Sequence, residues 1–144
     1  MALSGVDDRA HPTAAQTEAA LNRPLRILLV EDSAEDAELL QRALRREGLA
    51  AVYQRVDDPA DLKAALDAGA WDVILSDYRL PGFTGLEVVA QVQARGYDGP
   101  LILVSGTIGE ESVVEALKAG VHDYVLKDDL TRLSPAIRRE LREA

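Results

Sequence analysis

The sequence predicts an α/β fold in which a five-stranded parallel sheet is covered by helices on both faces. Five short apolar runs alternate with five segments that have the apolar spacing of helices. Most of the runs are continuously apolar, which is typical of parallel strands buried on both faces. Glycine follows four of the five helical segments, as expected at helix ends. This alternation is the pattern of a doubly wound sheet.

The chain of 144 residues has the composition of one globular domain, with 47% hydrophobic and 28% charged residues. Its net charge of −9 argues against nucleic-acid binding, because phosphate contacts need lysine and arginine. The lack of cysteine fits a reducing cytoplasm, and the sequence has neither a membrane-spanning run nor a signal peptide. We expect residues 1–24 to be a flexible leader or a weakly docked helix, and residues 25–144 to form the domain.

The first strand is expected at Ile27–Val30, a run of four apolar residues. Ser33 is a good N-cap for the helix that follows, and Asp36 lies three residues later, as in a capping box. Apolar residues recur at helical spacing as far as Glu47, and Gly48 suits the position just past a helix end.

Residues 50–56 are expected to form an edge strand, because Gln54 and Arg55 interrupt the apolar residues. No chemically active side chain stands out after this strand, which also agrees with an edge position. Asp58–Pro59 then favours the start of a second helix that ends at Gly69.

The third strand is expected at Val73–Leu75 and is followed by a single carboxylate, Asp77. Pro81 marks a tight loop before a third helix that runs from Leu86 to Gly96. On this stretch alone, Asp77 has two interpretations. It either faces a ligand at the end of a buried strand or only caps the next turn.

The last two strands are expected at Leu101–Val104 and Asp123–Leu126. The helix between them runs from Glu110 to Gly120 through Val113 and Leu117. The final helix has apolar residues spaced by three, four and four positions, namely Leu130, Leu133, Ile137 and Leu141. With right-handed crossovers the strand order is 2-1-3-4-5, which is the flavodoxin-like arrangement.

Chemically active side chains follow four of the five strands. They are Glu31 and Asp32 after the first strand, Asp77 after the third, Ser105 after the fourth and Lys127 after the fifth. The first and third strands flank the point where the strand order reverses, so the three acids converge there. Crowded carboxylates repel each other and need a cation, and oxygen ligands without thiols indicate Mg²⁺. A hydroxyl and an ammonium opposite the metal can hold a tetrahedral anion, which equips the site for phosphoryl transfer to a carboxylate.

Each of these residues also has a simpler interpretation. Glu31 and Asp32 suit the start of a helix, Ser105 suits a turn, and Lys127 could be a solvated surface lysine. The occurrence of all of them together, at the correct strand ends, favours the functional interpretation.

These motifs resemble the receiver domain of bacterial two-component response regulators. The resemblance extends from Arg26 to about Glu143. It rests on the Glu31–Asp32 pair, the Asp77-x-x-Leu80-Pro81-x-x-x-Gly85 run and the Gly120-Val121-His122-Asp123-Tyr124-Val125-Leu126-Lys127 run. It implies that Asp77 takes a phosphoryl group from a phosphohistidine of a sensor histidine kinase or a histidine phosphotransfer protein. It also implies that the chain is not an enzyme, apart from self-dephosphorylation.

The resemblance further implies a role for each site residue. The ligands of Mg²⁺ would be Glu31, Asp32, Asp77 and the backbone carbonyl of Arg79. Lys127 would pair with the phosphoryl group or with Asp77, and Ser105 would swing towards a phosphoryl oxygen while Tyr124 turns inward. This switch would remodel the face formed by the fourth helix, the fifth strand and the fifth helix. A downstream protein, a fused effector domain or a second copy, in a phosphorylation-dependent homodimer, would dock there.

Two other functions stay open. A pseudo-receiver would bind partners without phosphorylation, but the complete acid triad with Ser105 and Lys127 argues against it. An aspartate-based phosphohydrolase would need a second acid soon after Asp77 to protonate the leaving group, and Tyr78–Arg79 supplies none. Because no effector follows Ala144, output is expected through protein contacts unless the chain is part of a longer protein.

One position departs from the family pattern, because Asp128 follows Lys127 where the family usually has proline after a cis bond. A cis bond to a residue other than proline is disfavoured by roughly 2.5–4 kcal/mol, against about 0.5–1 kcal/mol for proline. We therefore expect a trans Lys127–Asp128 bond, with Asp128 or Asp129 capping the final helix. Arg79 and Thr107 each lie two residues past a site residue, and the resemblance places both beside the path of the hydrolytic water.

Overall fold

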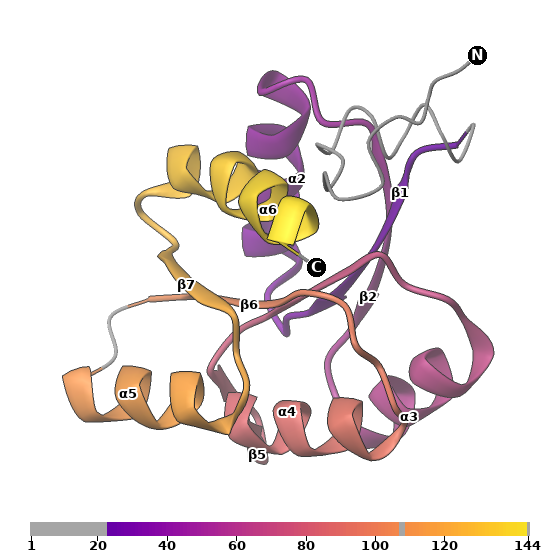
Figure 1. The fold of residues 1–144 in the computed structure, drawn as a ribbon, viewed down its shortest axis with the longest axis vertical. Coiled ribbons are helices and arrows are strands. Elements are labelled where there is room, and N and C mark those ends of the chain that lie inside the picture. Colours follow the sequence, from indigo (N-terminus) through magenta and orange to yellow (C-terminus); the bar gives the residue numbers. More distant parts are fainter. Residues whose placement is uncertain (1–22, 107–108, 144) are drawn as a thin grey trace.

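The computed structural model describes residues 23–106 and 109–143 and shows a central sheet between two layers of helices (Figure 1). The sheet contains β1 (Leu25–Val30), β2 (Ala51–Val56), β3 (Val73–Ser76), β6 (Leu101–Ser105) and β7 (Asp123–Leu126). The helices are α2 (Ala34–Arg46), α3 (Pro59–Ala68), α4 (Gly85–Ala94), α5 (Glu110–Ala119) and α6 (Leu133–Glu143). All neighbouring strands are parallel, in the order β2-β1-β3-β6-β7. This order confirms the predicted doubly wound fold, with β2 at an edge.

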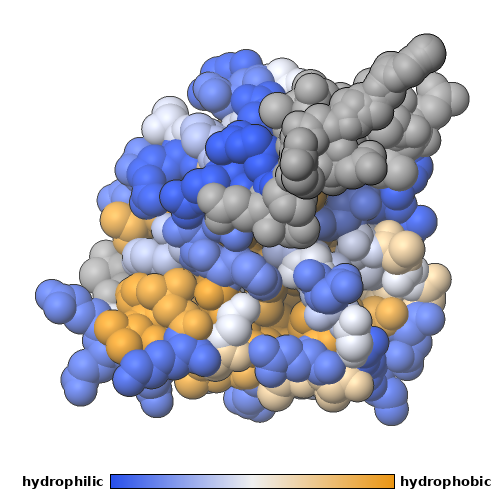
Figure 2. Space-filling view, viewed as in Figure 1, coloured by the Kyte–Doolittle hydropathy of each residue, from blue (hydrophilic) through white to orange (hydrophobic). Residues whose placement is uncertain are grey.

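The two helical layers present different surfaces. Helices α2 and α6 cover one face of the sheet, and α3, α4 and α5 cover the other. Figure 2 shows hydrophilic residues over α2 and α6, whereas hydrophobic residues gather on the half of the molecule that contains α4 and α5. On α5, Val114 and Leu117 are 48% and 45% exposed, and Ala116 is the buried residue of this helix. The helix is therefore docked less deeply than its predicted apolar spacing through Leu117 indicates.

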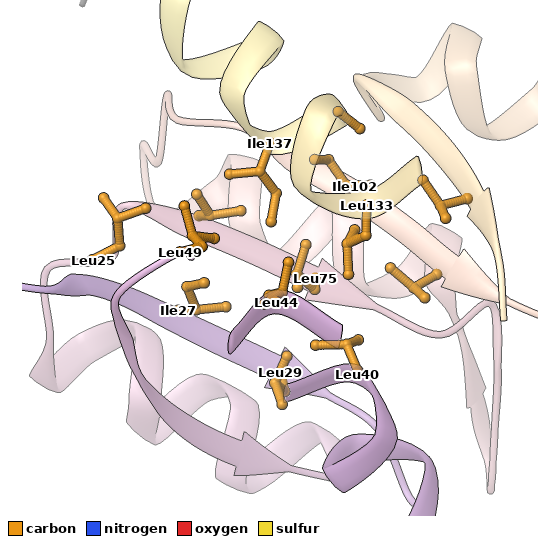
Figure 3. Close-up of a cluster of buried hydrophobic side chains, with 14 of the residues drawn as sticks. Leu25, Ile27, Leu29, Leu40, Leu44, Leu49, Leu75, Ile102, Leu133 and Ile137 are labelled. Atoms are coloured by element: carbon orange, nitrogen blue, oxygen red, sulfur yellow. The ribbon is translucent and has the colours of Figure 1, made fainter. Parts of the chain in front are cut away.

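The strands are buried on both faces because their side chains alternate between two apolar clusters. In β1, Ile27 and Leu29 join the cluster under α2 and α6, while Leu28 and Val30 join the cluster on the α3–α5 side. Figure 3 shows the first cluster, in which Leu44 of α2 and the two labelled α6 residues meet the sheet. A strand that serves two cores needs apolar residues at every position, which explains the continuous apolar runs.

A short hairpin follows β3 where the sequence indicated only a tight loop. Its strands β4 (Arg79–Leu80) and β5 (Phe83–Thr84) pair antiparallel, and Gly82 in the turn has φ +82°. Leu80 and Phe83 are buried, so the hairpin packs into the core beside the sheet. These two buried side chains anchor the segment after Asp77 on both sides of the hairpin turn.

The segment between β7 and α6 does not form the helix cap that the sequence predicts. A 3₁₀ turn, η1 (Leu130–Arg132), precedes α6, so the final α-helix starts at Leu133 rather than near Leu130. Asp129 precedes η1, but its carboxylate accepts a hydrogen bond from the Thr131 hydroxyl at 3.1 Å instead of capping backbone groups. None of the peptide bonds in the described ranges is cis, so the Lys127–Asp128 bond is trans, as expected.

The predicted leader lies almost entirely outside the described residues. Its last residues adjoin the domain, where Arg23 forms an ion pair with Asp72 at 2.9 Å. The Asp72 carboxylate also accepts the backbone N–H of Arg26 at 2.7 Å. Within 23–106 and 109–143, no helix combines the length and the apolar composition needed to cross a membrane.

Candidate functional site

The backbone places the predicted site residues at one edge of the sheet, because the strand hydrogen bonding continues past the strand ends. The Asp77 N–H donates to the Val30 carbonyl at 2.9 Å, which fixes Asp77 beside the end of β1. The Lys127 N–H donates to the Ser105 carbonyl at 2.8 Å, which fixes the end of β7 beside that of β6. Parallel strands leave all their carboxyl ends on one side, so the five predicted side chains share one site.

Asp77 occupies the centre of this site and is only 8% exposed. Its Oδ1 accepts the Ser105 hydroxyl at 2.7 Å and the Tyr78 N–H at 2.7 Å. Its Oδ2 accepts the Lys127 ammonium at 2.8 Å. Each carboxylate oxygen therefore faces a donor, and the side chain is fixed in one orientation.

Lys127 connects three carboxylates. Its Nζ lies 2.8 Å from Glu31 Oε1, 2.8 Å from Asp36 Oδ2 and 2.8 Å from Asp77 Oδ2. Burial alone would lower the pKa of Lys127, but its interactions with the accepting carboxylates of Asp36, Asp77 and Glu31 outweigh burial and raise that pKa. The ammonium is therefore charged throughout the physiological range and partly neutralises the acids.

Glu31 is buried, and burial is the largest influence on its carboxyl group, raising its pKa above the usual value. The contact with Lys127 and the Ser33 N–H, which donates to Glu31 Oε2 at 3.1 Å, act in the opposite direction. The negative charge of Asp77 adds to the rise in pKa. Glu31, Asp32, Asp36 and Asp77 are four acids around one ammonium, and this excess of acidic groups favours binding of a cation.

The predicted metal ligands fit Mg²⁺ in their chemistry. Glu31, Asp32 and Asp77 each offer a carboxylate oxygen, and these oxygens lie within 4.8 Å of one another. Asp32 is exposed, so the group opens to solvent on one side. Oxygen donors of this kind, with space for water, suit a hard divalent cation. The role of the Arg79 carbonyl as a further ligand stays a prediction.

Tyr124 is linked to the same edge of the sheet through Gly106, the residue that follows β6. It is half-buried, and its hydroxyl donates to the Gly106 carbonyl at 3.3 Å. Gly106 directly follows Ser105 in the sequence, and the switch role of Tyr124 stays a prediction. Thr107, predicted to lie near the hydrolytic water, is outside the described residues.

Asp36 is the site residue that the sequence analysis did not identify. It was assigned to a capping box, and the Ser33 hydroxyl indeed accepts the Asp36 N–H at 3.0 Å. The Asp36 carboxylate, however, binds Lys127 from the first turn of α2. The available signal was its position beside Ala37, the first core residue of α2, four residues after Asp32.

The family model of the response regulator receiver domain matches residues 27–138 of this chain. Sensory transduction protein RegX3 of Mycobacterium tuberculosis is 38% identical over 117 residues, which cover 81% of this chain and 50% of RegX3. Chemotaxis protein CheY-3 of Vibrio cholerae is 28% identical over 112 residues, which cover 76% of this chain and 85% of CheY-3. The chain thus spans half the length of RegX3 but most of CheY-3.

The fold also matches solved structures. The receiver domain of sensor histidine kinase PA1611 from Pseudomonas aeruginosa aligns with a TM-score of 0.70 and 26% sequence identity. The alignment covers 82% of this chain and 98% of that domain. In that crystal structure a magnesium ion is coordinated in the active-site cleft.

Proposed function

Because the chain belongs to the receiver-domain family of two-component response regulators, we propose that it is a phospho-acceptor switch. Asp77 takes a phosphoryl group from a phosphohistidine of a sensor histidine kinase or a histidine phosphotransfer protein. The observation that carries this proposal is the setting of the Asp77 carboxylate. It lies between the Ser105 hydroxyl and the Lys127 ammonium, at 2.7 and 2.8 Å, beside two further carboxylates.

The residues around Asp77 fit the chemistry of this transfer. A carboxylate oxygen of Asp77 attacks phosphorus, the phosphorus–nitrogen bond breaks, and the imidazole leaves with the electron pair of that bond. Lys127 places positive charge beside the incoming phosphoryl oxygens, and the Ser105 hydroxyl can donate to one of them. Glu31, Asp32 and Asp77 would hold Mg²⁺, which neutralises phosphoryl charge when bound.

We further propose a route from the phosphoryl group to the surface, supported by the contacts of Ser105 and Tyr124. Ser105 now donates to Asp77, and after phosphorylation it donates to a phosphoryl oxygen instead. This shift acts through Gly106 on the Tyr124 hydroxyl and changes the face formed by α5, β7 and α6. Exposed Val114 and Leu117 give this face apolar contact area for a partner, over a half of the molecule where hydrophobic residues gather (Figure 2).

We propose three forms of output at this face. A downstream protein can dock on it, a fused effector domain can pack against it, or a second phosphorylated copy can pair with it. The match to half of RegX3 is compatible with a fused effector, and the match to most of CheY-3 with a separate partner. We place all of these events in the cytoplasm, as the lack of cysteine suggests.

The decisive experiment is incubation with Mg²⁺ and acetyl phosphate, followed by mass spectrometry. The wild type should gain one base-labile phosphate on Asp77, and Asp77→Asn should gain none. Asp57→Asn, which alters an exposed carboxylate in a different acidic group, is the matched control and should be phosphorylated normally. A wild type without phosphate would identify a phosphorylation-independent interaction module. Turnover of unrelated phosphate esters would identify a phosphohydrolase.

A further inference from the structure

Asp36 is the third partner of Lys127, and it differs in kind from the other two. Its Oδ2 lies 2.8 Å from Lys127 Nζ, at the same distance as the oxygens of Glu31 and Asp77. The Lys127 ammonium donates hydrogen bonds to Asp36 and Asp77, and its contact with Glu31 is an ion pair. Glu31 and Asp77 belong to the carboxylate group that can hold a metal ion, whereas Asp36 does not.

The local structure fixes Asp36 in this position. Its backbone N–H is capped by the Ser33 hydroxyl at 3.0 Å, and the next residue, Ala37, is buried in the core. The same turn also holds Glu31, whose Oε2 accepts the Ser33 N–H at 3.1 Å. Ser33, the N-cap of α2, therefore links the predicted metal ligand Glu31 before the helix to the lysine partner Asp36 in its first turn.

We infer that Asp36 is a positioning residue that holds Lys127 when a divalent cation binds, an inference that rests on the proposed function. A cation at Glu31, Asp32 and Asp77 draws on two of the carboxylates that hold the ammonium. Asp36 then remains as the partner that keeps Lys127 beside Asp77. Without the Asp36 carboxylate, Lys127 would depend on Glu31 and Asp77 alone and would oppose the cation more strongly.

This role predicts weaker Mg²⁺ binding when Asp36 loses its charge. Asp36→Asn should raise the Kd for Mg²⁺ about tenfold, equivalent to about 1.4 kcal/mol. Asp36→Glu keeps the charge and should bind Mg²⁺ more tightly than Asp36→Asn. Glu35→Gln is the matched control, because Glu35 is exposed in the same helical turn and is not a partner of Lys127. It should change the Kd by less than about twofold, as expected for a screened surface charge.

The measurement is a Mg²⁺ titration of each variant followed by NMR chemical shifts, repeated in a Lys127→Met background. If Asp36 acts through the lysine, Asp36→Asn should leave the Kd unchanged in that background. A tenfold effect that persists without Lys127 would show that Asp36 acts directly on the ion and would overturn the inference. An equal effect of Glu35→Gln would overturn it as well.

Phosphorylation separates this inference from the proposed function. If the wild type binds Mg²⁺ and is phosphorylated on Asp77 while Asp36→Asn titrates like the wild type, the positioning role is wrong and the proposed function stands. If the wild type neither binds Mg²⁺ nor accepts a phosphoryl group, both are wrong.

Discussion

Replacing Asp77 by asparagine should raise the melting temperature of the metal-free protein. The oxygens of Glu31, Asp32 and Asp77 lie within 4.8 Å of one another. At that distance two unit charges repel by about 3 kcal/mol at an effective dielectric constant near 20. The share from exposed Asp32 is reduced by solvent. On the same scale, the 2.8 Å contact between Asp77 and Lys127 contributes an attraction of about 6 kcal/mol.

Repulsion and attraction therefore nearly cancel, and the burial of the carboxylate decides the sign. Asp77 is only 8% exposed, and a buried charge is penalised where a neutral amide of the same shape is not. The amide oxygen of asparagine can still accept one of the hydrogen bonds. We expect a gain of about 1–2 kcal/mol in unfolding free energy, or a rise of roughly 3–8 °C for a domain of this size.

Thermal melts in EDTA and in excess Mg²⁺ test this reasoning. Mg²⁺ at a hundred times its Kd stabilises the wild type by about 2.7 kcal/mol, so the advantage of Asp77→Asn should vanish or reverse. Glu35→Gln, which removes an exposed charge, should shift both melts little. Equal shifts of Asp77→Asn with and without Mg²⁺ would refute the clustering of the acids around Asp77.

Three further outcomes are expected. Arg79→Ala should speed the decay of phosphorylated Asp77, because exposed Arg79 lies two residues away and can screen the path of water; unchanged decay would contradict this role. Ser134→Ala should raise the unfolding free energy by about 1 kcal/mol in denaturant melts, because the buried Ser134 hydroxyl has no hydrogen-bond partner among the described residues. Burial raises the pKa of Tyr53 to about 12. The buried neutral phenol therefore contributes to the unfolding free energy below pH 10, and this contribution is lost as the pH rises to about 12. Tyr53→Phe should remove that alkaline loss in melts recorded across this range, and a loss of the same size in the variant would exclude Tyr53 as its source.

Much of the fold and of the site could be predicted because both depend on strands. The continuous apolar runs indicate strands that are buried between two apolar clusters. The position of the residue after each strand end is then determined by the pairing of the strands. Asp36 was missed because Ser33 and Asp36 fit a helix cap, and the cap hydrogen bond does form. Only the packing of α2 against the sheet determines that the same side chain reaches Lys127, which is 91 residues away in sequence.

Features that depend on weak local signals were also missed. The β4–β5 hairpin has strands of two residues each, too short for a period of two to be visible. In α5, the spacing of apolar residues predicts a buried stripe but gives no depth of docking. The 3₁₀ turn before α6 continues the apolar spacing of the helix that follows it. The spacing of apolar residues therefore cannot distinguish the 3₁₀ turn from the α-helix.

The hairpin after Asp77 holds the backbone around the proposed phosphoryl acceptor in place. Gly85, which follows β5, donates its N–H to the Tyr78 carbonyl at 2.6 Å, and a Cβ there would lie 3.3 Å from the Asp77 carbonyl oxygen. The backbone that carries the phosphoryl acceptor is thus clamped between the core and the start of α4. The proposed rearrangement would therefore come from the opposite side, where Ser105 lies at the end of β6 and Lys127 directly follows β7. In the proposed switch, the backbone around Asp77 would stay in place, and the displacement would fall on the β6–β7 flank of the sheet.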